Sequence, residues 1–209
     1  MLKIYGQWAS RAFRVAWLCK ESNIAYEHVN VTMMVANPTC KEPWYLALNP
    51  LGRMPTIEDD GLVMWESSAI NLYLAEKYKS PLWPADAAGR GRMLQWAFYI
   101  ANDVEVPMTL VFQHRFRFPP EMRKPALADE AEPQLLARLA PIEQALAKTP
   151  YLQGERWGMA DFIPASVLYS LYYMKYEKLA QFPHLAKWLA ASCERPAARE
   201  ARALRGDKG

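Results

Sequence analysis

A change of pattern near Pro84 constrains the fold more than any other feature of this sequence. Before Pro84, short β-like segments alternate with helical ones, and after it the sequence predicts helices and no convincing strand. Lys79–Pro84 has the character of a linker between the two halves. We therefore expect two domains, an α/β domain over residues 1–80 and an all-helical domain over residues 85–209.

The first half has the pattern of a small α/β domain. The expected elements are a strand, a helix, a strand, a loose helix, two strands and a helix, over Leu2–Tyr5, Arg11–Ser22, Tyr26–Val31, Pro38–Leu48, Thr56–Glu58, Leu62–Trp65 and Ser67–Tyr78. The opening βαβ unit predicts two parallel strands, and Asp60-Gly61 predicts a hairpin turn. This β-α-β-α-β-β-α order is that of a thioredoxin-like domain.

Apolar residues at helical spacing predict a bundle in the second half. Pro107 is expected to kink the first helix or divide it, and Pro119-Pro120 to end it. The expected helices cover Arg90–Phe118, Glu132–Lys148, Met159–Tyr176 and His184–Glu194. The basic tail Arg195–Lys208 is expected to be a solvated or frayed last helix rather than an interaction tail.

Composition narrows the functional class. With 52% hydrophobic residues among 209, the chain can bury a sizeable core, and disorder is excluded. The longest apolar stretch, Ala160–Tyr176, is interrupted by polar residues, so no membrane helix is expected. The N-terminus lacks the apolar run of a signal peptide, and we expect a cytoplasmic protein that does not bind membranes.

Charge and cysteine usage exclude further classes. A net charge of +3 is too small and too dispersed to indicate a nucleic-acid partner. The three cysteines and three histidines are scattered, without metal-ligand spacing, so neither a disulfide framework nor a metal site is expected.

Three motifs in order carry a family resemblance, at Asn49–Ile57 (NPLGRMPTI), Glu66–Ile70 (ESSAI) and Gly154–Asp161. Together they resemble the glutathione S-transferase family of cytosolic enzymes, over nearly the whole chain. Trp8-Ala9-Ser10 followed by Arg14-Val15 is similar to the serine-type classes (tau, zeta, theta and relatives). The sequence resembles bacterial members of the family. The resemblance implies a thioredoxin-like glutathione-binding domain, an all-α C-terminal domain and a homodimer.

Residue type alone favours an ordinary trans bond between Met54 and Pro55, because only about 5–6% of X-Pro bonds are cis. The resemblance implies a cis bond instead. It also implies that the main chain of Met54 pairs with the cysteine of glutathione, in the manner of an added strand.

Glu66 and Ser67 begin a helix, where an acid and a hydroxyl stabilise the first turn without any ligand. The resemblance gives them a second role, in which they bind the ammonium and carboxylate of the γ-glutamyl end of glutathione. It places Lys41 and Arg53 near the glycyl carboxylate, although both cations also suit a solvated surface.

Ser10 lies between a strand and a helix, where a serine commonly acts as the N-cap. The resemblance favours a catalytic role, because a hydroxyl there can donate to the glutathione thiolate and lower its pKa. Tyr5 is the alternative hydroxyl, although it suits the core. No cysteine lies near position 10, which disfavours mixed-disulfide chemistry.

The function expected from the resemblance is conjugation of glutathione, as co-substrate, to a small hydrophobic electrophile, with Trp8 and Met108 as the best candidates for its pocket. A glutathione-dependent isomerase or peroxidase and a non-catalytic binding protein of the same fold remain alternatives. In the third motif, Gly158 stands where the family has Ser or Thr as the helix cap, and Asp161 is expected to bond back to the N–H of Gly158.

Overall fold

The computed structural model describes residues 1–33 and 36–206, which form two compact units. The first unit comprises Met1–Trp83 together with the C-terminal segment from Glu194, and the second comprises Pro84–Cys193. The C-terminal segment therefore belongs with the α/β unit, although the sequence pattern predicts that it is part of the helical domain over residues 85–209.

A four-stranded mixed sheet forms the centre of the first unit, in the order β2-β1-β3-β4. Its strands are β1 (Lys3–Tyr5), β2 (Glu27–Val29), β3 (Thr56–Asp59) and β4 (Leu62–Trp65). As predicted, β1 and β2 are parallel, and β3 and β4 form an antiparallel hairpin. Asp60 and Gly61 both have positive φ angles, 50° and 85°, as a tight hairpin turn requires.

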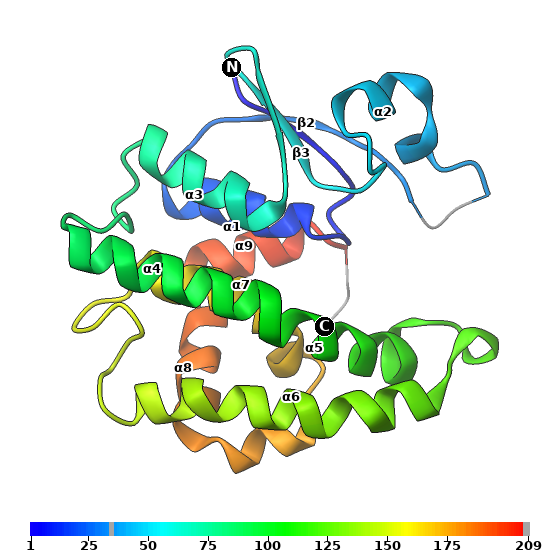
Figure 1. Ribbon diagram of the computed structural model, residues 1–209. Coiled ribbons are helices and arrows are strands. Elements are labelled where there is room, and N and C mark those ends of the chain that lie inside the picture. Colours follow the sequence, from blue (N-terminus) through cyan, green and yellow to red (C-terminus); the bar gives the residue numbers. More distant parts are fainter. Residues whose placement is uncertain (34–35, 207–209) are drawn as a thin grey trace. The chain divides into compact units, whose positions relative to one another are not determined.

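The helices of the first unit are α1 (Ala12–Glu21), α2 (Pro43–Leu48), α3 (Ser67–Lys77) and α9 (Pro196–Ala203), with a 3₁₀ turn, η1, at Thr39–Lys41. α1 packs against α3 and α9 (Figure 1). Phe13 and Trp17 of α1 and Ile70 and Leu74 of α3 are fully buried. The thioredoxin-like fold expected for the first half is confirmed.

The basic tail differs from its prediction as a solvated or frayed helix. Its residues form α9, and Ala198 and Ala201 are buried on the side where α9 packs against α1. Alanine side chains allow the close approach of the two helices, which accounts for stable docking despite the polar composition. Lys208, the end of the predicted tail, lies outside the described residues.

The second unit is helical throughout its described elements. These are α4 (Ala87–Tyr99), η2 (Ile100–Val104), α5 (Glu105–Phe112), η3 (Gln113–Arg117), η4 (Pro120–Met122), α6 (Pro125–Leu146), α7 (Met159–Tyr173), η5 (Glu177–Gln181) and α8 (Pro183–Cys193). Among the described residues, no helix combines the length and apolar character needed to cross a membrane.

The kink expected at Pro107 takes the form of a wider helical turn. The segment η2 is π-helical and lies just before the proline. Proline has no N–H for the carbonyl four residues earlier, here Asp103, and local π geometry accommodates such a defect. Pro119-Pro120 ends the helical run, as predicted, since η3 stops at Arg117.

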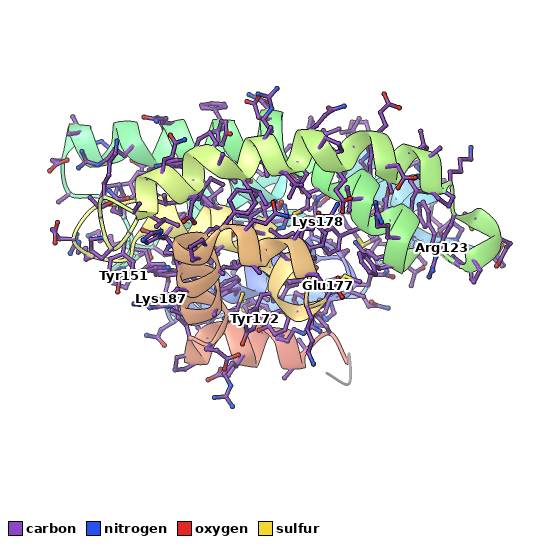
Figure 2. The ribbon with its side chains drawn as sticks, turned by 90° about the horizontal axis from the view of Figure 1, so that it is seen from below. Arg123, Tyr151, Tyr172, Glu177, Lys178 and Lys187 are labelled. Atoms are coloured by element: carbon purple, nitrogen blue, oxygen red, sulfur yellow. The ribbon has the colours of Figure 1, made fainter. Side chains whose placement is uncertain are left out.

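A buried carboxylate ties three segments of the second unit together. Glu132 in α6 accepts hydrogen bonds from Tyr176 at 2.8 Å, from Arg115 at 2.9 Å and from Lys178. Figure 2 labels Lys178 on the segment η5, which follows α7. Burial raises the pKa of Glu132, but the hydrogen bonds from Lys178 and Tyr176 and the charge of Arg115 outweigh it and hold that pKa below its ordinary value.

Asp161 organises the start of α7. Its carboxylate accepts from the backbone N–H of Gly158 at 3.1 Å, as predicted, and also from those of Leu152 at 2.7 Å and Gln153 at 3.1 Å. The indole N–H of Trp188 donates a fourth bond at 2.9 Å. Asp161 therefore stabilises the preceding loop and α8 as well as the helix it begins.

Candidate active site

Sheet register brings the predicted site segments to one end of the first unit. Tyr5 pairs with Thr56, and Thr56 pairs with Trp65, both in antiparallel register. The residues after Tyr5 and after Trp65 therefore lie beside the residues before Thr56. The loop that leads to Ser10, the loop that carries Met54 and the start of α3 at Ser67 consequently meet at this sheet end.

Met54 presents an unpaired main chain at this end. In the described part of the chain, neither its N–H nor its C=O has a hydrogen-bond partner. Its side chain is 6% exposed and packs in a cluster with Tyr5, Val31, Cys40 and Tyr45. The Met54-Pro55 bond is cis, as predicted. A buried side chain with free main-chain groups suits recognition of an extended peptide backbone.

A buried hydrogen-bond network holds the residue before Met54. The Tyr45 hydroxyl donates to the Arg53 carbonyl at 2.6 Å, and the Asn49 amide donates to the same carbonyl at 2.8 Å. Asn49 also donates to the Thr56 hydroxyl at 3.1 Å, which lies 2.8 Å from the Tyr45 hydroxyl. Because Tyr45 gives its proton to Arg53, the Thr56 hydroxyl is the donor in this last bond. The network fixes both sides of Met54-Pro55.

Lys41 and Arg53 lie at the same loop. The Lys41 ammonium donates to the Leu51 carbonyl at 3.4 Å, and it lies so close to Gly52 that a Cβ atom there would be 2.7 Å away. The Arg53 side chain is exposed, and no described residue pairs with its guanidinium. Two cations therefore flank the loop before Met54, which is a suitable arrangement for an anion. Their assignment to the glycyl carboxylate stays a prediction.

Glu66 and Ser67 mark the N-terminus of α3 and differ in exposure. Glu66 is exposed and has φ 76° and ψ 106°, an unusual conformation for a residue with a side chain. Ser67 is buried, and its hydroxyl accepts a bond of 3.4 Å from the Arg14 guanidinium. Neither side chain caps the helix through a hydrogen bond. The helix-capping hydrogen bond considered from the sequence is therefore absent here, and the ligand-binding role of this pair stays a prediction.

Ser10 lies in the turn that leads into α1. Its hydroxyl donates to the Gln7 carbonyl at 2.7 Å and accepts from the Ala12 N–H at 3.1 Å. The N-cap of α1 is Arg11, so Ser10 is not the N-cap considered from the sequence, although its second bond orders the turn before the helix. The side chain is partly exposed, and rotation about one bond redirects its proton to a ligand. Its catalytic role stays a prediction.

Tyr5 is a poor alternative to Ser10. Its side chain is buried, and its hydroxyl donates to the Glu58 carboxylate at 3.0 Å. Burial, this hydrogen bond and the charges of Glu58 and Glu27 raise the pKa of Tyr5 to about 12. The proton of Tyr5 is therefore firmly held by Glu58, and the hydroxyl contributes to the core.

The two residues predicted to contact the hydrophobic substrate lie in different units. Trp8 is partly exposed in the first unit, where its ring stacks on His28 at 4.0 Å and meets Tyr26 edge-on at 6.0 Å. His28 also bonds to the Gly6 carbonyl at 2.6 Å. Met108 lies in α5 of the second unit, with 5% of its surface exposed. Their contacts with a substrate stay predictions.

The three cysteines are free and buried. Within the described ranges, no group of three or more His, Cys, Asp or Glu side chains has an arrangement that can hold a metal ion.

Several residues that support the site have roles that were not predicted from the sequence. Asn49, the first residue of the Asn49–Ile57 motif, carried a signal, because Asn before Pro often bonds to its own turn, and its side-chain oxygen accepts from the Leu51 N–H at 3.1 Å. Nothing in the sequence marks Tyr45, His28 or the contact of Arg14 with Ser67. These contacts depend on which segments the sheet brings together.

The sequence matches two family descriptions that agree with this fold. Residues 1–76 match "Glutathione S-transferase, N-terminal domain" and residues 102–196 match "Glutathione S-transferase, C-terminal domain". The matched segments cover most of the chain and follow the family's domain order. The chain therefore belongs to the glutathione S-transferase family.

Curated relatives and solved structures support the same assignment. Glutathione S-transferase GstB of Escherichia coli K12 is 31% identical over 75% of this chain and 76% of its own. Glutathione S-transferase 4 of Zea mays is 30% identical over 94% of this chain and 90% of its own. A theta class enzyme from Xanthomonas axonopodis pv. citri, solved with glutathione bound, is 34% identical, with a TM-score of 0.84 over 96% of each chain.

Proposed function

We propose that this protein is a serine-type glutathione transferase, in which Ser10 stabilises the glutathione thiolate. The carrying observation is the convergence, at one sheet end, of the unpaired Met54 main chain, the Ser10 turn and the N-terminus of α3 at Ser67. The Met54 main chain can pair with a peptide backbone as a strand does, the Ser10 hydroxyl can donate to a sulfur atom, and the N-terminus of α3 can bind an anion. Family membership supports the same assignment.

Each end of glutathione has a matching group in the first unit. The γ-glutamyl carboxylate binds the Ser67 hydroxyl at the positive end of α3, and the ammonium binds the exposed Glu66 carboxylate. The cysteinyl backbone pairs with the N–H and C=O of Met54, beside Pro55. The glycyl carboxylate binds Lys41 and Arg53, whose charges lie at the Leu51–Met54 loop.

The chemistry begins with loss of the thiol proton to solvent. A free thiol has a pKa of about 8.5, so a donated hydrogen bond from Ser10 increases the thiolate fraction at neutral pH. The thiolate then attacks an electrophilic carbon of a hydrophobic compound, where the S–C bond forms as the bond to the leaving group breaks. Trp8 and Met108 are the proposed apolar contacts of that compound.

Two further properties belong to this proposal. Leu62, Val63 and Trp65 of β4 are exposed large apolar side chains on one strand, which supports a homodimer that covers them. The free state of all three cysteines supports a cytoplasmic location, where thiols remain reduced.

The test begins with a titration of the protein with glutathione, followed by tryptophan fluorescence. Electrophiles are then supplied at saturating glutathione, with activated aryl halides first and hydroperoxides and isomerisable substrates in parallel. We expect saturable binding and release of the leaving group from the aryl halide. Binding without turnover of any compound would favour a non-catalytic protein, and turnover of hydroperoxide alone would favour a peroxidase.

A further inference from the structure

The last helix is firmly attached to α1, the helix that follows the Ser10 turn. Arg195 donates two hydrogen bonds of 2.7 Å each to the Glu21 carboxylate, which also accepts from the Trp17 indole at 3.0 Å. Lys20 bonds to Glu200 at 3.1 Å. Figure 1 shows α9 beside α1. The segment that carries Arg205 is therefore anchored by contacts at several points along its length.

Arg205 extends this attachment to the loop before α1. Its guanidinium donates to the main-chain carbonyl of Trp8 at 3.2 Å. The guanidinium carbon also lies 5.4 Å from the centre of the buried Phe13 ring, within the range of a cation–π contact. α9 ends before Arg205, and the next residue, Gly206, has a positive φ of 68°.

These two contacts bracket Ser10 in the chain. Trp8 lies two residues before Ser10 and Phe13 three residues after it. Since the peptide group is planar, a hydrogen bond at the Trp8 carbonyl also fixes the direction of the Ala9 N–H, which belongs to the same peptide group. The Trp8 side chain is held as well, because its ring stacks on the ring of His28. Both the N–H and the hydroxyl of Ser10 depend on this turn, because both donate to the Gln7 carbonyl, at 3.0 and 2.7 Å.

We infer that Arg205 is a positioning residue for Ser10, which it serves by holding the Trp8 peptide. The inference rests on the proposed function, in which the Ser10 hydroxyl donates to the glutathione sulfur. A small rotation of the 7–10 turn redirects that hydroxyl, whereas Met54, Glu66 and Ser67 lie on other segments. Loss of Arg205 therefore weakens activation of the thiol and leaves recognition of the tripeptide intact.

The test compares Arg205→Ala and Arg205→Lys with Arg199→Ala. Arg199 is the matched control, since it is exposed on α9, the helix just before Arg205, and its side chain has no hydrogen bond or ion pair among the described residues. The pKa of bound glutathione is followed by thiolate absorbance against pH. Affinity for S-methylglutathione, which lacks the titrating thiol, is measured by calorimetry, and the thermal midpoint of each variant is recorded.

For Arg205→Ala, we expect the pKa of bound glutathione to rise by about 0.5–1 unit, which is a three- to tenfold loss of thiolate below that pKa. The dissociation constant for S-methylglutathione should stay within about twofold of the wild-type value, because the residues proposed to bind the tripeptide lie on other segments. Arg205→Lys should recover part of the shift, because an ammonium can still donate to the Trp8 carbonyl. Arg199→Ala should match the wild type.

Two results would overturn the inference alone. In the first, the wild type lowers the thiol pKa of bound glutathione and Arg205→Ala lowers it equally, even if the thermal midpoint of the variant falls. The other is an equal rise in Arg199→Ala, which would indicate a general effect of charge. If the wild type itself binds glutathione without lowering the thiol pKa, the proposed role of Ser10 fails and this inference fails with it.

Discussion

The hydroxyl of Tyr45 donates a hydrogen bond of 2.6 Å to the carbonyl of Arg53, the residue before the proposed docking edge. Tyr45→Phe removes this bond and leaves Arg53 with the Asn49 amide alone. We expect the free energy of unfolding to fall by about 1 kcal/mol. Glutathione affinity should fall by about three- to tenfold, because Met54 is held less firmly. Denaturant unfolding and calorimetry measure the two effects.

Tyr151→Phe is the matched control for Tyr45→Phe. Tyr151 lies in the second unit (Figure 2), and its hydroxyl has no hydrogen bond among the described residues. Its loss should change neither measurement. A Tyr45→Phe protein with wild-type affinity would show that the network supports the fold and does not position Met54.

Glu66 combines an exposed carboxylate with a strained backbone, so two substitutions separate its roles. Glu66→Ala removes the carboxylate and keeps the strain, while Glu66→Gly removes both. Each should weaken glutathione binding by about 1.5–3 kcal/mol, the range for a charge-assisted bond. Glu66→Gly should be more stable than Glu66→Ala by about 1 kcal/mol. Equal stability of the two variants would contradict the strain, and full affinity in both would contradict the γ-glutamyl assignment.

Ser10→Ala separates activation from binding. The hydroxyl bonds to Gln7 and Ala12 in the free protein, so its loss should cost about 1 kcal/mol of stability. Glutathione affinity should barely change, while the pKa of the bound thiol rises toward its free value. Each unit of this rise corresponds to about 1.36 kcal/mol of lost thiolate stabilisation, so the rate deficit should shrink as the assay pH is raised.

Ser10→Thr is the control, because it keeps a hydroxyl at the same position. It should retain a depressed thiol pKa. If Ser10→Ala leaves the titration and the rate unchanged while glutathione still binds, the Ser10 hydroxyl only orders the turn before α1.

The raised pKa of Asp161 leads us to expect a specific pH dependence of the free energy of unfolding. Burial raises its pKa to about 6 from an ordinary 3.8, and this exceeds the lowering by its four hydrogen bonds. A carboxyl with a raised folded pKa contributes stability that is present below its unfolded pKa and lost as pH rises through its folded pKa. Asp161→Ala should therefore cost more at pH 5 than at pH 7, by about 1.3 kcal/mol. Denaturant unfolding of both proteins at the two pH values measures the difference.

Asp161→Asn tests the hydrogen bonds separately from the charge. The amide keeps the shape of the side chain but replaces one accepting oxygen by a donor, which faces N–H groups. We expect a loss of about 1–3 kcal/mol at pH 7. Wild-type stability in this variant would contradict the organising role of Asp161.

The apolar side chains of β4 predict a dimer that depends on them. The protein should sediment as a dimer, and Val63→Glu should shift it toward the monomer, because a charge cannot be buried unpaired at an interface. Met122→Glu is the control, since Met122 is an exposed apolar residue of the second unit. Dissociation by both variants, or by neither, would contradict the assignment of the interface to β4.

Local signals were sufficient to predict most of the first unit. β4 begins and ends where the sequence places it, because the Asp60-Gly61 turn fixes one end and the start of α3 fixes the other. The docking of α9 was not predictable in the same way. Its buried face consists of small alanines, and charged residues make the helix strongly polar overall, so the segment has the composition of a solvated helix.

The candidate site shows the same division between local and distant signals. Glu66, Ser67 and Met54 stand in short contiguous motifs, and the motifs alone direct attention to them. Tyr45, His28 and Arg205 act through single contacts to the backbone of other segments. The Arg205 contact with Trp8 joins residues 197 positions apart. Periodicity and turn chemistry contain no information about such pairs.

The return of α9 to α1 has a consequence for the order in which the chain is made. A ribosome synthesises Met1–Trp83 and then the whole of Pro84–Cys193 before the residues that complete the first unit emerge. Until then, Glu21 lacks Arg195 and the Trp8 carbonyl lacks Arg205. The nascent α/β unit thus keeps one helix face uncovered until the whole of the helical unit has been synthesised.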